Sequence, residues 1–378
     1  MFPIYVISKG RPSDVMRRGT TDHLSKFDIP HFIMVEPEEK ERYEKHKTKC
    51  ATVLTIPQSE RDKDPERFCR WSVGKEEELG ASMGRGAVAS RNSTKRHAEQ
   101  SGAKAFYNMD DNATGFFKWM TESELNFYDC WHALHQKEKT PEEERTYRRN
   151  LEEWGMAKIS MARFKPHERD KVIRIFFDDF EPNLFKIDNM GFIGYNTVDA
   201  APGSVHQHLG RSLGRRVYSC TLMKTDYPLD WWGQTSDDVL LNIDCLCNGY
   251  WMACLWRWVM GKPMTQTTKG GCTTDAYGHR EGEALQKTKG KGKGIAEKTP
   301  AYAISTYPKT RFITSMYPQY LTTRAWKRRI HHEFLWKLMP TPEVKIDLTK
   351  EAPEARSGID HLFPEMRAAY ERAKIKKR

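Results

Sequence analysis

The first 112 residues of the chain alternate short apolar runs with longer polar segments, and this alternation sets narrow limits on the fold. Each apolar run has the length of a strand and ends in turn or polar residues. We predict strands at residues 2–8, 31–35, 51–56 and 105–109. Residues 87–100 favour a helix that Gly102 can end. Strands that alternate with helices predict an α/β fold with a mixed, mostly parallel central sheet.

The pattern changes after residue 117. Residues 118–185 are highly charged and predict a mainly helical insertion, in which Thr140 and Pro141 occupy the cap and first positions of a helix. Between residues 286 and 298 lies a run, residues 287–294, in which Lys alternates with Thr or Gly, and this run predicts a basic loop. Further strands are predicted at residues 172–177, 190–195 and 216–223, and further helices at residues 239–250 and 365–378.

The composition argues against a disordered chain and against a membrane protein. Hydrophobic residues make up 38% of the 378 residues, with 11 Trp, 15 Tyr and 17 Phe, enough for a sizeable core. The most apolar stretch, residues 240–260, is interrupted by Asn242, Asp244 and Arg257, and the apolar start is too short for a signal segment. We therefore expect a cytoplasmic protein without a membrane partner.

The net charge indicates a class of binding partner, and the cysteine spacing indicates the state of the thiols. The chain has 62 Lys and Arg against 51 Asp and Glu, and its formal net charge of +11 favours a polyanion such as a nucleic acid. Its 8 Cys never form a Cys-x-x-Cys pair, which argues against a zinc site and for reduced thiols.

Asp110 and Asp111 follow the predicted strand 105–109, at the end of the sheet where ligands collect in open α/β folds. Two adjacent carboxylates repel each other unless a cation lies between them. A divalent metal that binds a sugar-nucleotide diphosphate, with Asn112 beside the pair, accounts for this arrangement. The alternative is a surface turn after the strand.

Two further acid pairs lie later in the chain. Asp178 and Asp179 stand in an apolar context that favours a turn at a strand end. Asp237 and Asp238 precede the predicted helix at 239–250, where the helix dipole favours acidic residues. Taken alone, neither pair requires a catalytic role.

A glycine turn and a histidine pair are the remaining candidate functional motifs. Lys269, Gly270 and Gly271 form a compact turn whose backbone amides can approach an anion, although no Gly-Lys-Ser/Thr follows to make it a P-loop. His331 and His332 follow a basic and aromatic segment that suits phosphates, and a structural role is the alternative.

The order of these parts along the chain resembles that of GT-A glycosyltransferases. The resemblance is to the DNA-modifying members that include the base J glucosyltransferase and the phage TET-associated glycosyltransferases, and it covers residues 1–117 and 186–335. The chain differs in having Asp-Asp where the family usually has Glu-Asp at 237–238, and Cys272 where Asn is common. The matching segments are YVISKGRP (5–12), RN (91–92), NMDDN (108–112), NMGFIG (189–194), RVYSC (216–220), DD (237–238), LCNGY (246–250), KGGCT (269–273) and RRIHH (328–332).

The resemblance implies a GT-A (Rossmann-like) fold with a helical insertion. Its parts would be a nucleotide-sugar-binding half at residues 1–117, the insertion at 118–185, an acceptor and catalytic half at 186–282, and a basic loop with the C-terminal region at 283–378.

The activity implied is transfer of a sugar from a UDP-sugar to the hydroxymethyl group of a 5-hydroxymethylpyrimidine in DNA, with 5-hydroxymethylcytosine favoured. The reaction would depend on a metal and invert the anomeric carbon, and the target base would be flipped out of the duplex. We expect a monomer, located in the host cytoplasm if a phage encodes it.

The resemblance also assigns site residues. Asp238 would be the general base, supported by Asp237. The ligands of Mn²⁺ or Mg²⁺ would be Asp110, Asp111, Asn112 and His332. The donor-binding residues would be Ser8, Lys9, Arg11, Arg91, Lys269, Gly270 and Gly271.

For the DNA backbone, the candidates are basic residues in two groups. They are Lys287, Lys289, Lys291, Lys293, Arg324, Lys327, Arg328 and Arg329. For the first four, a solvated loop is the alternative. Trp231 and Trp232 are candidates for stacking on a flipped pyrimidine, with core packing as the alternative.

Two other classes of function remain open at this stage. A GT-A enzyme acting on a glycan, lipid or protein would share the donor residues without needing a basic acceptor face. A non-catalytic DNA-binding protein on the same fold would leave both acid pairs unexplained. The sugar, the choice between cytosine and uracil derivatives, and the strandedness of the DNA are not fixed by these residues.

Overall fold

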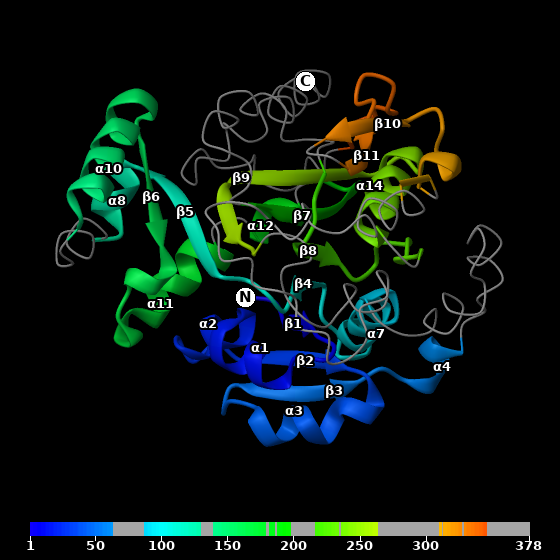
Figure 1. The fold of residues 1–378 in the computed structure, drawn as a ribbon, viewed down its shortest axis with the longest axis horizontal. Coiled ribbons are helices and arrows are strands. Elements are labelled where there is room, and N and C mark those ends of the chain that lie inside the picture. The colour runs from blue at the N-terminus through cyan, green and yellow to red at the C-terminus, as the bar shows by residue number, and fades with distance from the viewer. Residues whose placement is uncertain are drawn as a thin grey trace, which may run out of the picture.

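The fold is built around one large mixed sheet. A computed structural model describes residues 1–62, 87–129, 139–178, 181–185, 187–197, 216–233, 236–263, 310–311, 313–326 and 329–345. Within them, nine strands form a sheet in the order β3-β2-β1-β4-β8-β7-β9-β5-β6 (Figure 1). Two more strands form a separate pair, β10-β11.

The first half of the sheet is parallel: β1 pairs with β2 and β4, and β2 pairs with β3. Every residue of β1 is buried, as expected for a central parallel strand covered on both faces. The strands are β1 (Ile4–Ile7), β2 (His31–Val35), β3 (Ala51–Thr55) and β4 (Ala105–Asp110). The helices are α1 (Pro12–Arg18), α2 (Thr20–Ser25), α3 (Lys40–His46), α4 (Gln58–Arg61) and α7 (Ala87–Gln100).

These elements confirm the predictions for the first hundred residues. The four strands and the helix at 87–100 were each expected within one or two residues of their observed ends. Helix α7 packs against β1, β2 and β4, and its residues 89–95 are all buried.

The second half of the sheet is mixed. Strand β8 runs antiparallel to both β4 and β7, β7 is parallel to β9, and β5 is antiparallel to both β9 and β6. The elements are β8 (Cys220–Lys224), β7 (Met190–Thr197), β9 (Trp251–Gly261) and α14 (Asp237–Cys247). The expectation of a mostly parallel sheet is therefore wrong for this half, because β8 runs against both of its neighbours.

The predicted insertion at 118–185 contains helices and also two strands. Thr140 caps α10 as predicted, since its hydroxyl accepts from the Glu143 amide at 3.2 Å and the Glu143 carboxylate accepts from the Thr140 amide at 3.1 Å. Strands β5 (Gly115–Thr121) and β6 (Met156–Ser160) extend the central sheet. The longer helical segments are α8 (Glu122–Phe127), α10 (Pro141–Trp154), α11 (Arg169–Ile173) and α12 (Glu181–Phe185).

The strand predicted at 172–177 is wrong. This run forms the end of α11 and a π-helical turn over Arg174–Asp178. Val172, Ile175 and Phe176 are all buried, at the three- and four-residue spacings of a helix face. A short apolar run does not by itself distinguish a buried strand from a buried helix.

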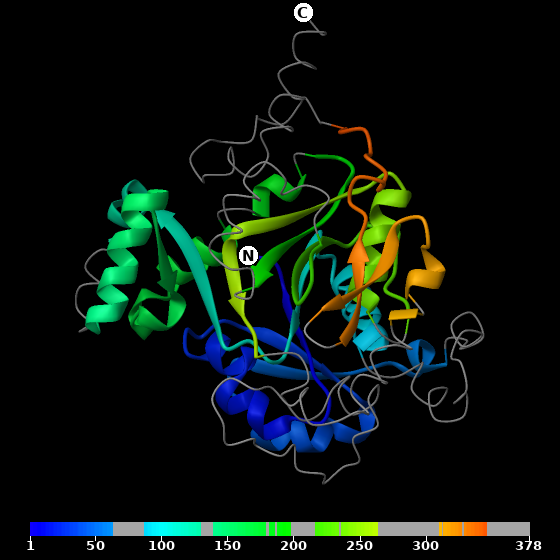
Figure 2. The ribbon, with the colours of Figure 1, turned by 45° about the horizontal axis from the view of Figure 1, so that its top comes forward.

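A hairpin of β10 (Leu321–Trp326) and β11 (Arg329–Phe334) lies beside α14 in both views (Figures 1 and 2). The helices α8 and α10 lie at the opposite end of the molecule, next to β5 and β6. A large apolar cluster contains residues from both halves of the sheet, and two smaller clusters lie in the parallel half. No helix in the described ranges is long and apolar enough to cross a membrane.

Candidate active site

Asp110 and Asp111 lie where β4 ends beside β1. Asp110 is in register with Ile7, so Ser8 lies next to the acid pair. The Asp111 carboxylate accepts hydrogen bonds from Ser8 Oγ and from Arg11 Nη1, each at 2.6 Å. Asp111 thus joins two of the predicted donor-binding residues in one buried cluster.

A threonine from α2 fixes the backbone of this acidic loop. Thr20 Oγ1 donates to the Asp110 carbonyl at 2.5 Å and accepts from the Ala113 amide at 3.1 Å. The Thr20 amide donates to the Asp111 carbonyl at 3.0 Å. Two of these bonds hold the carbonyls of Asp110 and Asp111, and the third holds the Ala113 amide, so Thr20 anchors the backbone that carries both acids.

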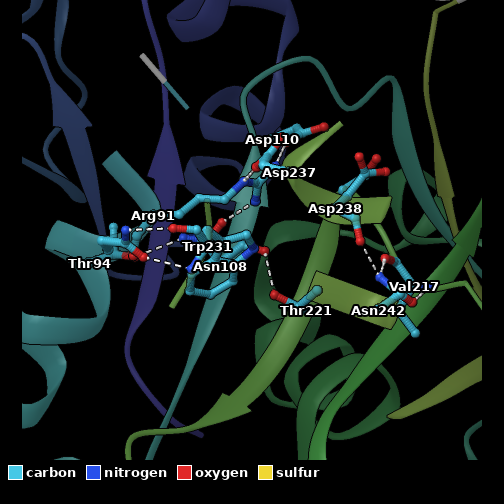
Figure 3. Close-up of polar contacts among 12 residues, drawn as sticks. Arg91, Thr94, Asn108, Asp110, Val217, Thr221, Trp231, Asp237, Asp238 and Asn242 are labelled. Carbon is cyan, nitrogen blue, oxygen red and sulfur yellow. Dashed lines mark hydrogen bonds and ion pairs between the residues drawn. The ribbon is translucent and has the colours of Figure 1, made fainter. Parts of the chain in front are cut away.

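Arg91 on α7 joins the two acid pairs that lie far apart in the sequence (Figure 3). Its Nη2 donates to Asp110 Oδ1 at 2.8 Å, and its Nε donates to Asp237 Oδ2 at 2.9 Å. Its Nη1 donates to Asn108 Oδ1 at 2.5 Å, and Asn108 Nδ2 donates to Thr94 Oγ1 at 2.8 Å. The guanidinium is buried, and each of its three nitrogens donates to a protein acceptor.

The second oxygen of Asp110 contacts a lysine. Lys262 Nζ lies 2.5 Å from Asp110 Oδ2 and 2.7 Å from Ser219 Oγ. Ser219 has a left-handed backbone (φ 72°), and its carbonyl accepts from the Asp110 amide at 2.7 Å. Residues held in this conformation cluster at functional sites.

Asp237 and Asp238 begin α14 and differ in exposure. Asp237 is buried against Arg91, whereas Asp238 is half-buried. Asn242, one turn further along, donates to the Asp238 carbonyl at 2.5 Å and pairs with both the amide and the carbonyl of Val217 at 2.7 and 2.8 Å. The helix start is thereby tied to the segment that leads into Ser219.

Burial and the surrounding cations shift the pKa values of the acids in different directions. Burial acts to raise the pKa of Asp110, but Lys262 and Arg91 outweigh it and the pKa falls well below its usual range. Burial raises the pKa of Asp111 in spite of Arg11, and it raises the pKa of Asp237 in spite of Arg91. Of Asp110, Asp111 and Asp237, only Asp110 has surroundings that favour its charged form.

The ligand chemistry of this cluster fits a divalent metal. Three of the carboxylates, Asp110, Asp111 and Asp237, form ion pairs with Arg11, Arg91 and Lys262. The Asn112 side-chain oxygen is buried and finds no hydrogen-bond partner in the described part of the chain. Carboxylate and amide oxygens are the ligands that Mg²⁺ and Mn²⁺ prefer.

His332 is not grouped with these oxygens. It is buried on β11, where its Nε2 lies 3.3 Å from Arg216 Nη1. Among the residues the structure describes, no three His, Cys, Asp or Glu side chains gather to form a metal site. The metal-binding role of His332 stays a prediction.

Other predicted site residues are dispersed. Lys9 Nζ lies 3.9 Å from a carboxylate oxygen of Glu36, which follows β2. Arg324 is exposed on β10 and forms an ion pair with Glu333 at 3.0 Å.

The two tryptophan candidates lie near α14. Trp231 is buried, and its backbone amide and carbonyl are bonded to the Asn92 side chain, so core packing is the correct alternative for it. Trp232 is half-buried and donates to Asp244.

Several predicted residues lie outside the described residues. They are Asp179, Lys269, Gly270, Gly271, Lys287, Lys289, Lys291, Lys293, Lys327, Arg328 and the side chain of Arg329.

Sequence reasoning missed five residues of this site. Asn108 stood inside the quoted NMDDN segment, and Ser219 stood inside RVYSC, so both were within reach of the motif. Thr20, Asn242 and Lys262 carry no local signal, because only the three-dimensional fold brings them to the acids.

A family model described as TET-Associated Glycosyltransferase matches residues 2–271 of the chain. This range includes Ser8, Arg91, both acid pairs of the cluster and Lys262, and it excludes the hairpin with His332. No curated protein and no solved structure matches the chain.

Proposed function

The chain belongs to the TET-associated glycosyltransferase family, and from this premise we propose that it transfers a sugar from a UDP-sugar to the hydroxymethyl group of a 5-hydroxymethylpyrimidine in DNA. We take 5-hydroxymethylcytosine as the favoured base. The observation that carries the proposal is the position of Arg91, whose guanidinium contacts Asp110 of the first acid pair and Asp237 of the second.

In this proposal the first acid pair serves the donor. Asp110, Asp111 and Asn112 would hold Mn²⁺ or Mg²⁺, which when bound supplies positive charge for the departing diphosphate. Ser8 and Arg11 orient Asp111 from the end of β1. Because Arg91 uses three nitrogens on protein acceptors, we assign it to positioning the acids in place of the nucleotide contact first expected.

The second acid pair serves the acceptor. Asp237 is held by Arg91, whereas Asp238 is half-buried on the same first turn and so is the carboxylate open to an acceptor. The hydroxymethyl oxygen would bond to the anomeric carbon while the bond from that carbon to the diphosphate oxygen breaks. The acceptor proton passes to Asp238, late in the step because a carboxylate is a weak base for an alcohol. Attack opposite to the leaving group inverts the anomeric centre.

The acceptor must leave the base stack to reach such a site. Flipping a nucleotide out of a duplex costs a few kcal/mol, which phosphate contacts must offset. The net charge of +11 and the basic residues predicted for DNA supply those contacts in this proposal.

The test is to incubate the protein with 5-hydroxymethylcytosine and 5-hydroxymethyluracil oligonucleotides, Mn²⁺ and a panel of UDP-sugars, and to measure the mass of the DNA. We expect a gain of one sugar per modified base. Asp238→Asn should lower the rate by about 10²-fold to 10⁴-fold, as loss of a general base does. Its affinity for UDP should remain within about twofold of the wild type, because Asp238 serves the acceptor.

The control is Asp226→Asn, which makes the same chemical change at an exposed aspartate after β8 and should keep full activity. Wild-type turnover in Asp238→Asn would remove that residue from the base role. DNA that never gains mass, while a glycan, lipid or protein acceptor does, would favour the other class of acceptor.

A further inference from the structure

Lys262 occupies a position that no motif predicted. It is the first residue after β9, and its ammonium contacts Asp110 on the side opposite to Arg91. Both oxygens of the Asp110 carboxylate are thus already neutralised by cations, one fixed and one on a flexible side chain.

Contacts of the preceding residue, Gly261, fix the position of the Lys262 backbone. The Gly261 carbonyl accepts from the Thr114 amide at 2.8 Å, and a Cβ at Gly261 would lie 2.6 Å from Thr114 Oγ1. This close approach ties the end of β9 to the loop that follows the acid pair. Lys262 therefore begins at a fixed point and reaches Asp110 with a side chain that is still partly exposed.

A bound divalent cation and a bound diphosphate would have opposite effects on the Lys262 ammonium. A divalent cation on Asp110 would stand beside the Lys262 ammonium, and like charges at such distances repel. A diphosphate that arrives with that cation brings negative charge to the same place, and a lysine ammonium is a common phosphate ligand. Arg91 cannot move from Asp110 to the diphosphate, because it is buried and each of its three nitrogens donates to a protein acceptor.

On the basis of the proposed function, we propose that Lys262 is a donor-binding residue that exchanges partners: it neutralises Asp110 before the metal binds, and it contacts the diphosphate of the nucleotide sugar afterwards. Metal and donor binding then support each other. Asp110 would hold either the Lys262 ammonium or the metal, and an ammonium released from Asp110 would add a contact to the donor.

The experiment measures binding without DNA or turnover. Mn²⁺ affinity of the intact chain is measured by electron paramagnetic resonance of the free ion, and UDP affinity by calorimetry with and without Mn²⁺. Without nucleotide, Lys262→Gln should bind Mn²⁺ about tenfold more tightly, because a charge-assisted hydrogen bond no longer competes. With saturating Mn²⁺, it should bind UDP about tenfold more weakly.

Two further variants keep the result interpretable. Lys262→Arg keeps the positive charge and should restore UDP affinity to within about threefold, which also covers the case that the glutamine variant is poorly folded. Lys26→Gln removes an exposed lysine on the surface and should change neither affinity. Thermal melting of each variant checks that the fold is intact.

Unchanged or weaker Mn²⁺ affinity in Lys262→Gln would overturn the exchange, and so would unchanged UDP affinity. A wild-type chain that binds no Mn²⁺ would overturn it as well. Failure of the proposed function has a different signature, since DNA that gains no sugar would leave the Mn²⁺ and UDP affinities of these variants as expected here.

Discussion

Thr20 and Thr21 are adjacent buried threonines on α2 whose hydroxyl groups have opposite surroundings. Thr20 Oγ1 bonds to the Asp110 carbonyl and the Ala113 amide, whereas Thr21 Oγ1 has no hydrogen-bond partner in the described part of the chain. Their neighbouring positions and equal size offer a matched comparison of one hydroxyl that holds the acidic loop with one that does not.

We expect Thr20→Val to lower the free energy of unfolding by about 1–3 kcal/mol, because it leaves the buried Ala113 amide without its partner. It should also weaken Mn²⁺ binding, since the loop that carries Asp110 and Asp111 loses its anchor. Thr21→Val removes an unsatisfied polar atom and should be neutral or slightly stabilising. Urea unfolding and Mn²⁺ titration of both variants check this, and equal behaviour of the two would contradict it.

At the scale of elements, the positions of β1 to β4 and α7 were predictable because each apolar run in the first hundred residues is bounded by turn residues. The placement of Asp110 beside Ser8 follows from the parallel pairing of β1 with β4. Strand β9 was not predicted, because the apolar stretch 240–260 contains most of α14 and β9 with only a turn at Asn248 and Gly249 between them. The contact of Lys262 with Asp110 depends on β9 and so was beyond sequence reasoning.

The packing of β7 against the segment before β8 leaves no room for a side chain at Gly194. A Cβ there would lie 1.9 Å from Val217 Cγ1 and 2.9 Å from the Cys220 carbonyl. Val217 has little freedom to retreat, because its amide and carbonyl are both bonded to Asn242. Since Asn242 also bonds to the Asp238 carbonyl, a shift of this segment moves the proposed general base.

We therefore expect Gly194→Ala to lower the free energy of unfolding by about 1–3 kcal/mol, as overpacking does, and also to reduce sugar transfer. Thr140→Ala is the comparison, because it removes the cap of α10 at the far end of the sheet and should cost about 1 kcal/mol without loss of activity. Chemical denaturation gives the stability, and the DNA mass assay gives the transfer rate. Full activity in Gly194→Ala would mean that the segment tolerates the shift.

At the scale of the whole molecule, the sheet brings together groups from both halves of the chain. Asp110 comes from the parallel half, Asp237 and Asp238 come from the helix before β9, and Arg91 from α7 contacts both sides. The acidic cluster occurs in a chain of net charge +11, so the positive charge that attracts a polyanion must lie elsewhere. The Lys-rich segment at 287–293 is the predicted place for part of it.

The last prediction concerns this segment and the salt dependence of DNA binding. Each phosphate that a lysine neutralises adds about 0.9 to the slope of log affinity against log salt on duplex DNA. Replacing Lys289, Lys291 and Lys293 with Gln should therefore reduce that slope by up to about 3 and weaken binding at low salt. The control replaces Lys45, Lys47 and Lys49, which are exposed and have the same spacing, so the net charge changes equally. Fluorescence anisotropy over a range of salt concentrations measures both slopes. If the salt slope falls equally in the two triple variants, only the total charge matters. If it falls more in the variant of Lys289, Lys291 and Lys293, this Lys-rich segment contacts the DNA backbone directly.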